Sequence, residues 1–523
     1  MPSTLPAPQA VLPSRRPWPL HGLAATRQLE AQGLAATPPQ ALMQRAGLAT
    51  ARLALALAPH AQRIWVAAGP GNNGGDALEA ALHLQRWGRQ VQVSLLATPE
   101  RLPADARVAW QRAQAAGLVL QPGLPAQIDA ELCLDGLLGL GLGPRSARPA
   151  DDAIAEAMRR LNAQAAPVLA IDLPSGLDGG SGQVHGGLAV NATHTLSLLT
   201  LKPGLFTAAG RDHAGRIWFD DLGLGEAWAS APADAWLAGP PTATPRRHAQ
   251  HKGSFGDVLV LGGASGMGGA ALLAARAALA AGAGRVFVAR LDGQQALLTD
   301  ALRPELMPRQ AAEVLAPEFL AAATVVCGCG GGRAIAPLLP AVLEHARRLV
   351  LDADALNALA ADPVLAASLA QRQSATLLTP HPLEAARLLG CGVAQVQADR
   401  LASAQALALQ TGAGVLLKGS GTVIAPAGTA LPPAALRINP TGNARLGTAG
   451  SGDVLAGWLG GRWSQTGEHQ DASGLQAAAD SVWCHGRAAE TGPLALPLRA
   501  ADLIEAMVET LAAVAGGTAD PTA

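Results

Sequence analysis

Three glycine-rich segments in the first half of the chain carry side chains that can bind a polar ligand or exchange a proton. GPGNNGGD (69–76) contains the spacing G-x-G-x-x-G after an apolar run at 64–68, and CLDGLLGLGLGPR (133–145) and VLAIDLPSGLDG (168–179) carry aspartate at strand-like ends. A nucleotide-binding Rossmann turn needs an acidic residue after the next strand, and VQVSLL (91–96) has none. A turn that only reverses the chain is the alternative, but asparagine and aspartate beside the glycines favour a polar binding loop.

Four polar side chains in these segments suit metal binding and acid–base chemistry. Because the carboxyl ends of parallel strands meet at one edge of a sheet, we expect Asn73, Asp135 and Ser175 to lie together. Their amide, carboxylate and hydroxyl oxygens suit an alkali or alkaline-earth cation. Asp172 remains as a candidate acid or base. Each segment alone could still be a simple turn, since aspartate, proline, serine and glycine are common turn residues.

The second half contains a comparable segment, NPTGNARLGTAGSGDVLAGWLGG (439–461). Gly447, Gly450 and Gly452 precede a helical pattern that begins near Asp453. Free N–H groups at such a helix start bind anions, and the carboxylate can take a proton from a hydroxyl. Phosphoryl transfer needs little beyond this arrangement and a metal. The alternative is a glycine-rich loop capped by an aspartate.

Lys418 is one of only three lysines in the chain and stands in the hairpin-like segment LLKGSGTVIA (416–425). It is either a ligand-binding residue or an exposed lysine in a turn. A further strand ends in glycines within HKGSFGDVLVLGGASGMGG (251–269). The sequence G-x-x-x-x-G-K-[ST] is absent, which excludes a Walker P-loop.

Apolar, β-branched runs alternate with helical patterns along the chain, which predicts mostly parallel sheets covered by helices on both faces. A stretch at 226–247 is rich in alanine, proline and threonine without periodicity, and it predicts a linker between domains at 20–225 and 248–515. The expected strands are 64–68, 90–96, 132–135, 167–172, 194–199, 257–261, 285–289, 324–327, 348–352, 376–379, 414–417 and 422–425. The expected helices are 41–57, 76–87, 104–116, 151–162, 268–281, 382–389, 397–411, 451–460, 474–490 and 501–514.

Composition limits the classes of function. The 523 residues are 49% hydrophobic and 15% charged, which suits two or three well-buried domains. The net charge of −1 offers no basic surface for nucleic acid. Five scattered cysteines predict reduced thiols in a cytoplasm. The Cys327–Cys329 pair lacks a second pair nearby, so we expect buried small apolar residues there rather than a metal site. Neither a signal peptide nor a membrane span is evident, and we expect no membrane partner.

The three N-terminal segments together resemble the NAD(P)H-hydrate epimerase family over roughly residues 20–225. The resemblance implies a Rossmann-like three-layer α/β/α domain that interconverts the R and S forms of hydrated NADH or NADPH (NADHX and NADPHX). Ala77 stands where the family usually has glycine, and Leu140 where threonine is common. The implied potassium ligands are Asn73, Asp135 and Ser175. The implied substrate contacts are Asn72, Asn73, Gly74, Gly75, Asp76, Gly139, Leu140, Gly141, Leu142, Gly143, Pro144, Arg145 and Asp172, the last also catalytic.

The segments HKGSFG, LDADALN, TPHP and GSGD, in this order, resemble the ribokinase-like ADP-dependent (S)-NAD(P)H-hydrate dehydratases over roughly residues 240–515. The resemblance implies that ADP, with Mg²⁺, phosphorylates the hydrate and that phosphate then leaves, giving NAD(P)H and AMP. The chain differs from the usual motif of this family at Ala444, Arg445 and Ala449. The implied nucleotide contacts are Lys418, Gly419, Ser420, Gly421, Thr422 and Gly452. The implied hydrate contacts are Ala270, Gly330, His381 and Asp453, the last also catalytic.

The sequence therefore predicts a bifunctional repair enzyme for hydrated NAD(P)H, whose epimerase supplies the S form to the dehydratase. We expect a homo-oligomer. One alternative is a ribokinase-like small-molecule kinase with an appended ligand-binding domain, which explains GSGD but not the three N-terminal loops. Another is a non-catalytic binding or scaffold protein, against which Asp172 and Asp453 argue.

Overall fold

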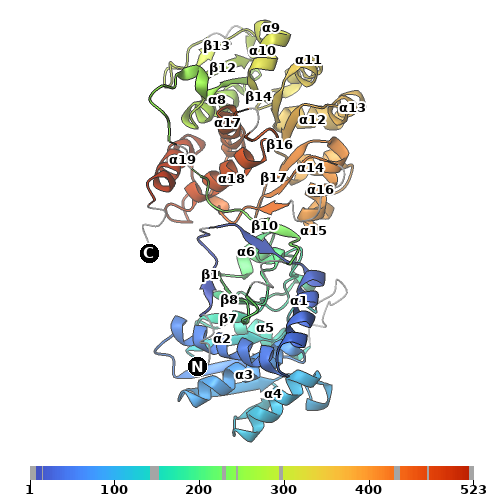
Figure 1. Cartoon of the computed structure of the whole chain (residues 1–523), viewed down its shortest axis with the longest axis vertical. Coiled ribbons are helices and arrows are strands. Elements are labelled where there is room, and N and C mark those ends of the chain that lie inside the picture. The colour runs from blue at the N-terminus through green and yellow to red at the C-terminus, as the bar shows by residue number, and fades with distance from the viewer. Residues whose placement is uncertain are drawn as a thin grey trace. The chain divides into compact units, whose positions relative to one another are not determined.

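The computed structural model describes residues 7–14, 16–141, 152–225, 231–242, 245–293, 298–428, 436–467 and 470–517. The chain divides into two compact units between Ala235 and Trp236 (Figure 1). This division falls inside the segment 226–247, for which the sequence predicted a linker. That segment is not all linker, because Ala235–Leu237 forms strand β10 and pairs with β19 (Arg437–Ile438). A three-residue strand has too few positions for an apolar alternation, so local composition did not reveal it.

The first unit is built on a sheet in the order β1-β9-β8-β7-β6-β3-β4-β5. Only the edge strand β1 is antiparallel to its neighbour, and the other pairs are parallel. The short strand β2 (Trp18–Leu20) forms a parallel bridge from Leu20 to Leu201. The sheet strands are β1 (Gln9–Ala10), β3 (Arg63–Ala68), β4 (Gln90–Leu95), β5 (Leu120–Pro122), β6 (Leu132–Gly136), β7 (Val168–Ile171), β8 (His194–Leu198) and β9 (Arg216–Asp220).

Helices cover both faces of this sheet, so the unit has three layers. Successive residues of β3 point to opposite faces. Ile64 and Val66 belong to the core shared with the helices on one face, whereas Trp65 packs with Met158 and Leu161 of α5 on the other. The helices of the first core are α1 (Leu23–Ala36), α2 (Ala41–Leu57), α3 (Asn72–Arg86) and α4 (Ala104–Ala115); α5 is Ala153–Asn162, and α6 (Gly210–His213) is a single turn.

The second unit contains a sheet in the order β13-β12-β11-β14-β15-β16-β17-β18-β19-β10. The strands from β13 to β17 are parallel, and β18 is antiparallel to both of its neighbours. The strands not yet given are β11 (Asp257–Gly262), β12 (Arg285–Arg290), β13 (Met307–Pro308), β14 (Thr324–Cys327), β15 (Arg348–Leu351), β16 (Ala375–Leu378), β17 (Gly414–Leu417) and β18 (Val423–Ala425).

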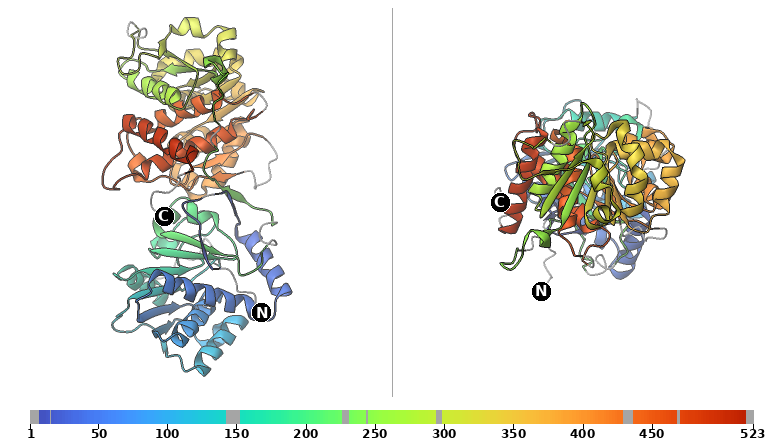
Figure 2. Two further views of the ribbon diagram at one scale, coloured as in Figure 1. Left: turned by 60° about the vertical axis from the view of Figure 1, so that its left-hand side comes forward. Right: turned by 90° about the horizontal axis from the view of Figure 1, so that it is seen from above.

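Two groups of helices sandwich this sheet, as Figure 2 shows from above with the C-terminal helices in red on one side. On that side α8 and α17 lie unusually close. A Cβ on Gly457 would stand 1.9 Å from the carbonyl oxygen of Ala274, and one on Gly461 would stand 2.4 Å from that of Ala278. The small residues of both helices are therefore required by packing. The helices are α8 (Gly268–Ala280), α9 (Ala311–Val314), α10 (Pro317–Ala322), α11 (Leu339–His345), α12 (Ala353–Ala361), α13 (Pro363–Ala370), α14 (Pro382–Leu389), α15 (Val393–Ala398), α16 (Arg400–Thr411), α17 (Ser451–Ser464), α18 (Leu475–Ala489) and α19 (Ala500–Ala515).

The predicted fold class, two α/β domains, is confirmed. Each of the twelve expected strands overlaps a strand of the structure, and each expected helix overlaps a helix. The sequence missed α1, α6, the helices from α9 to α13, and the strands β1, β2, β5, β9, β10, β13 and β19. Most of these elements are too short to carry a clear periodicity, whereas α1 has 14 residues. Among the helices that the structure describes, none is both long enough and apolar enough to cross a membrane.

Candidate active sites

Asn73, Asp135 and Ser175 meet at one edge of the first sheet, because β3, β6 and β7 are parallel neighbours. Ser175 donates to Asp135 from its backbone N–H (2.8 Å to Oδ2) and from its hydroxyl (2.6 Å to Oδ1). Asn73 Nδ2 donates to the carbonyl of Leu138 at 2.9 Å, and the N–H of Leu138 donates to Ser175 Oγ at 2.9 Å. Asn73 and Ser175 thus hold the backbone of Leu138, and Asp135 holds Ser175.

The cluster of Asn73, Asp135 and Ser175 contains oxygen atoms that suit the binding of a cation. Asp135 and Ser175 are fully buried. Burial raises the pKa of Asp135 to about 6, although hydrogen bonds from Ser175 and Leu137 oppose the rise. Among the residues that the structure describes, Asn73 Oδ1 is a buried acceptor without a hydrogen-bond partner. A buried carboxylate and an unpaired amide oxygen form an environment that a cation would stabilise.

A cavity of about 540 Å³ lies beside this cluster. The predicted contacts Asn72, Asn73, Asp76, Gly139, Leu140, Gly141 and Asp172 all line it. Gly74 and Gly75 do not line it, and both are closely packed: a Cβ on Gly74 would stand 2.0 Å from Gly69 O, and one on Gly75 would stand 2.9 Å from the Cα of Ala106. The expected contacts Leu142, Gly143, Pro144 and Arg145 lie outside the described residues.

Asp172 reaches the cavity from a constrained backbone position. Its φ is +67°, a left-handed conformation that is uncommon for residues other than glycine. Lys202, fully buried, forms a close ion pair with Asp172 Oδ1 and also donates to the carbonyl of Leu198 at 2.7 Å. Sequence reasoning missed this role of Lys202, although the scarcity of lysine was a usable signal. It also missed Glu30, which lines the cavity from α1.

In the second unit, Asp453 stands in the first turn of α17, behind Gly450, whose φ is +88°. One ligand atom each of Cys329, Asp352 and Asp453 lies within 4.8 Å of the others. Burial, and then the charge of Asp352, raise the pKa of Asp453 to about 6, while Cys329 and Lys418 lower it. A carboxyl with such a pKa changes protonation state near neutral pH, as a general base should.

Lys418 lies at the same helix start and is not an exposed turn lysine. Its Nζ donates to Asp352 Oδ1 at 2.8 Å, and a Cβ on Gly452 would stand only 3.3 Å from that Nζ. Thr379 Oγ1 donates to the same carboxylate oxygen at 2.7 Å. The expected nucleotide contacts Lys418 and Gly452, which are distant in sequence, are therefore brought together.

The remaining glycines and hydroxyls of the hairpin follow Lys418 directly. Gly419 has a φ of +134°, and a Cβ there would stand 2.9 Å from the buried guanidinium of Arg400. Gly421 is also left-handed, with a φ of +65°. Thr422 accepts a hydrogen bond of 2.9 Å at its carbonyl from Asn439 N–H, and Ser420 stands between the two glycines. This hairpin requires glycine for its conformation.

The other expected hydrate contacts occupy the ends of neighbouring strands and helices. Gly330, after β14, has a φ of +56°, and a Cβ there would stand 2.8 Å from that of Ala270 on α8. His381 caps α14 by accepting from two backbone N–H groups at Nδ1. The backbone N–H of His381 donates at 2.8 Å to Glu384 Oε2. Burial is the largest of the causes that raise the pKa of Glu384. The structure thus puts Ala270 beside Gly330 and ties His381 to Glu384.

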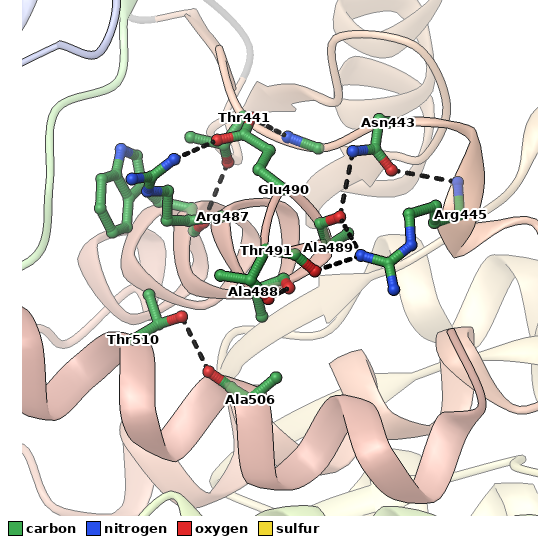
Figure 3. A network of polar contacts seen from close by, with 12 residues as sticks. Thr441, Asn443, Arg445, Arg487, Ala488, Ala489, Glu490, Thr491, Ala506 and Thr510 are labelled. Carbon is green, nitrogen blue, oxygen red and sulfur yellow. Dashed lines mark hydrogen bonds and ion pairs between the residues drawn. The ribbon is translucent and has the colours of Figure 1, made fainter. Parts of the chain in front are cut away.

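The loop before α17 is fixed to the end of α18 by the polar network in Figure 3. Asn443 Nδ2 and Arg445 Nη1 each donate to the carbonyl of Ala489 at 3.0 Å, and Arg445 Nη1 also donates to that of Thr491. The N–H of Gly442 donates to a carboxylate oxygen of Glu490 at 2.8 Å. Arg445 is buried. Arg445, which differs from the residue usual in the dehydratase motif, therefore stabilises the glycine-rich loop.

Known proteins match most of the length of this chain. The family of the YjeF-related protein N-terminus matches residues 39–204, and the NAD(P)H-hydrate dehydratase family matches residues 258–506. The bifunctional NAD(P)H-hydrate repair enzyme Nnr of Coxiella burnetii is 38% identical over 466 residues, covering 86% of this chain and 89% of that one. Its Escherichia coli counterpart is 36% identical over 471 residues, covering 86% and 84%.

One similar solved structure is the ADP/ATP-dependent NAD(P)H-hydrate dehydratase from Bacillus subtilis, co-crystallised with ATP and Mg²⁺. It is 27% identical, with a TM-score of 0.41, and the match covers 52% of this chain and 93% of that one.

Proposed function

This chain belongs to the family of bifunctional NAD(P)H-hydrate repair enzymes, and on that premise we propose a division of labour between its units. The first unit interconverts the R and S forms of NADHX and NADPHX. The second unit dehydrates the S form with ADP, giving NAD(P)H, AMP and phosphate. The observation that carries the proposal is that each unit holds its own aspartate, Asp172 or Asp453, at the carboxyl edge of a parallel sheet.

In the first unit the hydrate occupies the cavity beside Asn72, Asp76 and Gly139–Gly141, with Asp172 as the acid or base. Potassium is held by Asn73 Oδ1, Asp135 and Ser175. The unpaired Oδ1 of Asn73 and the buried Asp135 carboxylate support this assignment. When bound, potassium supplies positive charge that balances Asp135, so the loop through Leu138 keeps its place beside the substrate.

In the second unit, the residues from Lys418 to Thr422 and Gly452 hold ADP, and Ala270, Gly330, His381 and Asp453 contact the hydrate. Asp453 takes the proton of the hydrate hydroxyl, whose oxygen attacks the terminal phosphorus of ADP, and AMP leaves with the bonding electron pair. The ring nitrogen then supplies electrons that expel phosphate, and the neighbouring carbon loses a proton, which restores NAD(P)H. Mg²⁺, when bound with ADP, offsets phosphate charge. The ammonium of Lys418 beside Gly452 supports this placement.

Two further expectations stay proposals. A homo-oligomer is tested by light scattering during size-exclusion chromatography. A cytoplasmic location is supported by the five cysteines, all free in the structure.

The proposed function is tested with purified R and S epimers supplied separately. With ADP, the S epimer should give NADH absorbance at once, and the R epimer should do so after epimerisation, faster than the spontaneous reaction allows. Full conversion of R at only the spontaneous rate would contradict the role of the first unit. An ADP-independent return of NADH from S would contradict that of the second. A kinase acting on stable alcohols would instead consume nucleotide without producing NADH.

A further inference from the structure

Six ionisable side chains line the cavity of the first unit. They are Arg27, Glu30, Asp76, Asp105, Asp172 and Lys202. Asp172 follows β7, whereas Asp76 stands in α3, so two carboxyl groups reach the substrate space from different elements. Of these two carboxyl groups, Asp172 is the one that is hydrogen-bonded to the buried ammonium of Lys202 in the described part of the chain. The two carboxyls therefore have unlike surroundings, and unlike surroundings separate the roles of acid and base.

Lys202 fixes one oxygen of Asp172 and leaves the other for substrate. Its Nζ pairs with Asp172 Oδ1, donates to Leu198 O at 2.7 Å and lies 3.4 Å from Ser197 Oγ, so its position is fully determined. The backbone N–H of Leu198 also donates to Oδ1, at 3.2 Å. The other oxygen, Oδ2, faces the cavity loop, since a Cβ on Gly139 would stand 3.9 Å from it. An adjacent ammonium favours the charged form of a carboxylate.

Asp76 is in the opposite situation. Burial raises its pKa well above the usual range, and the charges of Asp172, Glu30, Glu79 and Asp105 raise it further. Burial, and then Asp172, also raise the pKa of Glu30. A carboxyl group in such surroundings keeps its proton and can donate it.

We propose that Asp172 is the base and Asp76 the acid of the epimerisation, and that Lys202 is the positioning residue that gives these roles to the two aspartates. This inference rests on the proposed function of the first unit. The hydrate carries its hydroxyl on a carbon bonded to the ring nitrogen. Asp172 accepts the hydroxyl proton, the O–H electrons form a C=O bond, and the C–N bond breaks with its pair moving to nitrogen. Asp76 protonates that nitrogen.

The open form then closes by the reverse steps after the carbonyl group has turned over. Nitrogen attacks the opposite face, returns its proton to Asp76, and the oxygen regains the proton held by Asp172. Atoms and charges balance, and no oxidant or further reactant is needed. The ring opening requires one acid and one base on the same substrate, which is the arrangement that the cavity offers.

The test follows interconversion of the epimers by chromatography across the pH range in which such carboxyls titrate, without ADP. The wild type should show a bell-shaped profile of kcat/KM. Asp76→Asn should lose the basic limb and be about 10²–10⁴-fold slower. Lys202→Met should lower kcat for interconversion by about 10–10²-fold with a smaller change of KM, because Asp172 loses its anchor, and Lys202→Arg should restore part of the rate. Asp129→Asn, which changes an exposed carboxylate of the same unit that pairs with Arg63 outside the cavity, should keep both limbs.

Each outcome decides the inference. An unfolding transition of the first unit at the wild-type midpoint shows that each variant is folded, because that unit forms a compact body of its own. An unchanged kcat in Lys202→Met, or an intact basic limb in Asp76→Asn, would overturn the assignment. If Lys202→Met fails to fold, the near-isosteric Asp76→Asn still decides it. A wild type that does not accelerate interconversion at all contradicts the proposed function instead.

Discussion

Lys418 donates a hydrogen bond of 2.8 Å to Asp352, a residue 66 positions earlier in the chain. Asp352 is only 2% exposed, so the ion pair compensates a buried charge. Removal of one partner from a buried pair leaves the other uncompensated, which typically costs about 3–5 kcal/mol. We therefore expect Lys418→Met to lower the free energy of unfolding of the second unit by about that amount, measured by urea denaturation. The double variant Lys418→Met, Asp352→Asn should recover part of the loss; equal stability of the single variant and the wild type would contradict the pair's role.

Asp453→Asn should lower the dehydration rate by about 10²–10⁴-fold, because the amide cannot accept the hydroxyl proton. Conversion of S hydrate to NADH measures this rate, and epimerisation of R to S should stay unchanged. Asp354→Asn is the matched control, since Asp354 is a nearby carboxylate that accepts a hydrogen bond from Gly332 N–H. A rate close to the wild type in Asp453→Asn would exclude Asp453 as the base.

Dehydration should also weaken as the pH falls through about 6, the pKa to which burial and then Asp352 raise Asp453. Activity should fall on the acidic side because Asp453 must be deprotonated to act as a base. Its raised pKa means that it becomes protonated at a higher pH than an ordinary aspartate does. The measurement is kcat/KM for S hydrate against pH at saturating ADP. Because Lys418 lowers the pKa of Asp453, the midpoint in Lys418→Met should move to higher pH. A profile that stays flat well below the expected midpoint would contradict this prediction.

Gly419→Val should raise the KM for ADP in dehydration, with a smaller effect on the KM for the hydrate. At a φ of +134° a side chain is strained, and its Cβ would stand 2.9 Å from Arg400 Nη1. The hairpin must therefore move away from its position beside Gly452. Gly390→Val is the control, because Gly390 has a φ of +65° but open space around it. Equal changes of the ADP KM in both variants would show that strain alone is responsible.

Asp135→Ala should abolish both potassium binding and epimerisation, while dehydration of S hydrate continues. The buried carboxylate anchors Ser175 through two hydrogen bonds, and Ser175 in turn contacts Leu138. The readouts are the rise in Tm of the first unit with potassium over lithium, and the conversion of R hydrate. Glu131→Ala is the control at the opposite end of the same strand, where Glu131 accepts from Gln62 and Arg63. A Tm rise and conversion of R hydrate at wild-type levels in Asp135→Ala would overturn the ion site.

The sequence by itself determined the fold class and the segments that carry the chemistry. Glycine-rich loops after apolar runs mark the carboxyl ends of parallel strands, and these loops do lie at the edges of the two sheets. Parallel order alone was enough to bring Asn73, Asp135 and Ser175 together. Sequence also identified Lys418 as an unusual residue, although it left an exposed turn position open.

Only the tertiary structure decided which charges face one another. Lys202 belongs to no glycine-rich segment, yet it is buried against Asp172, and Glu30 enters the cavity from a helix that periodicity did not reveal. Nothing in the sequence indicated that Gly74 and Gly75 are closely packed against Gly69 and Ala106. The physical reason is that motif spacing describes the backbone of one segment, while burial and ion pairing depend on segments that folding brings together.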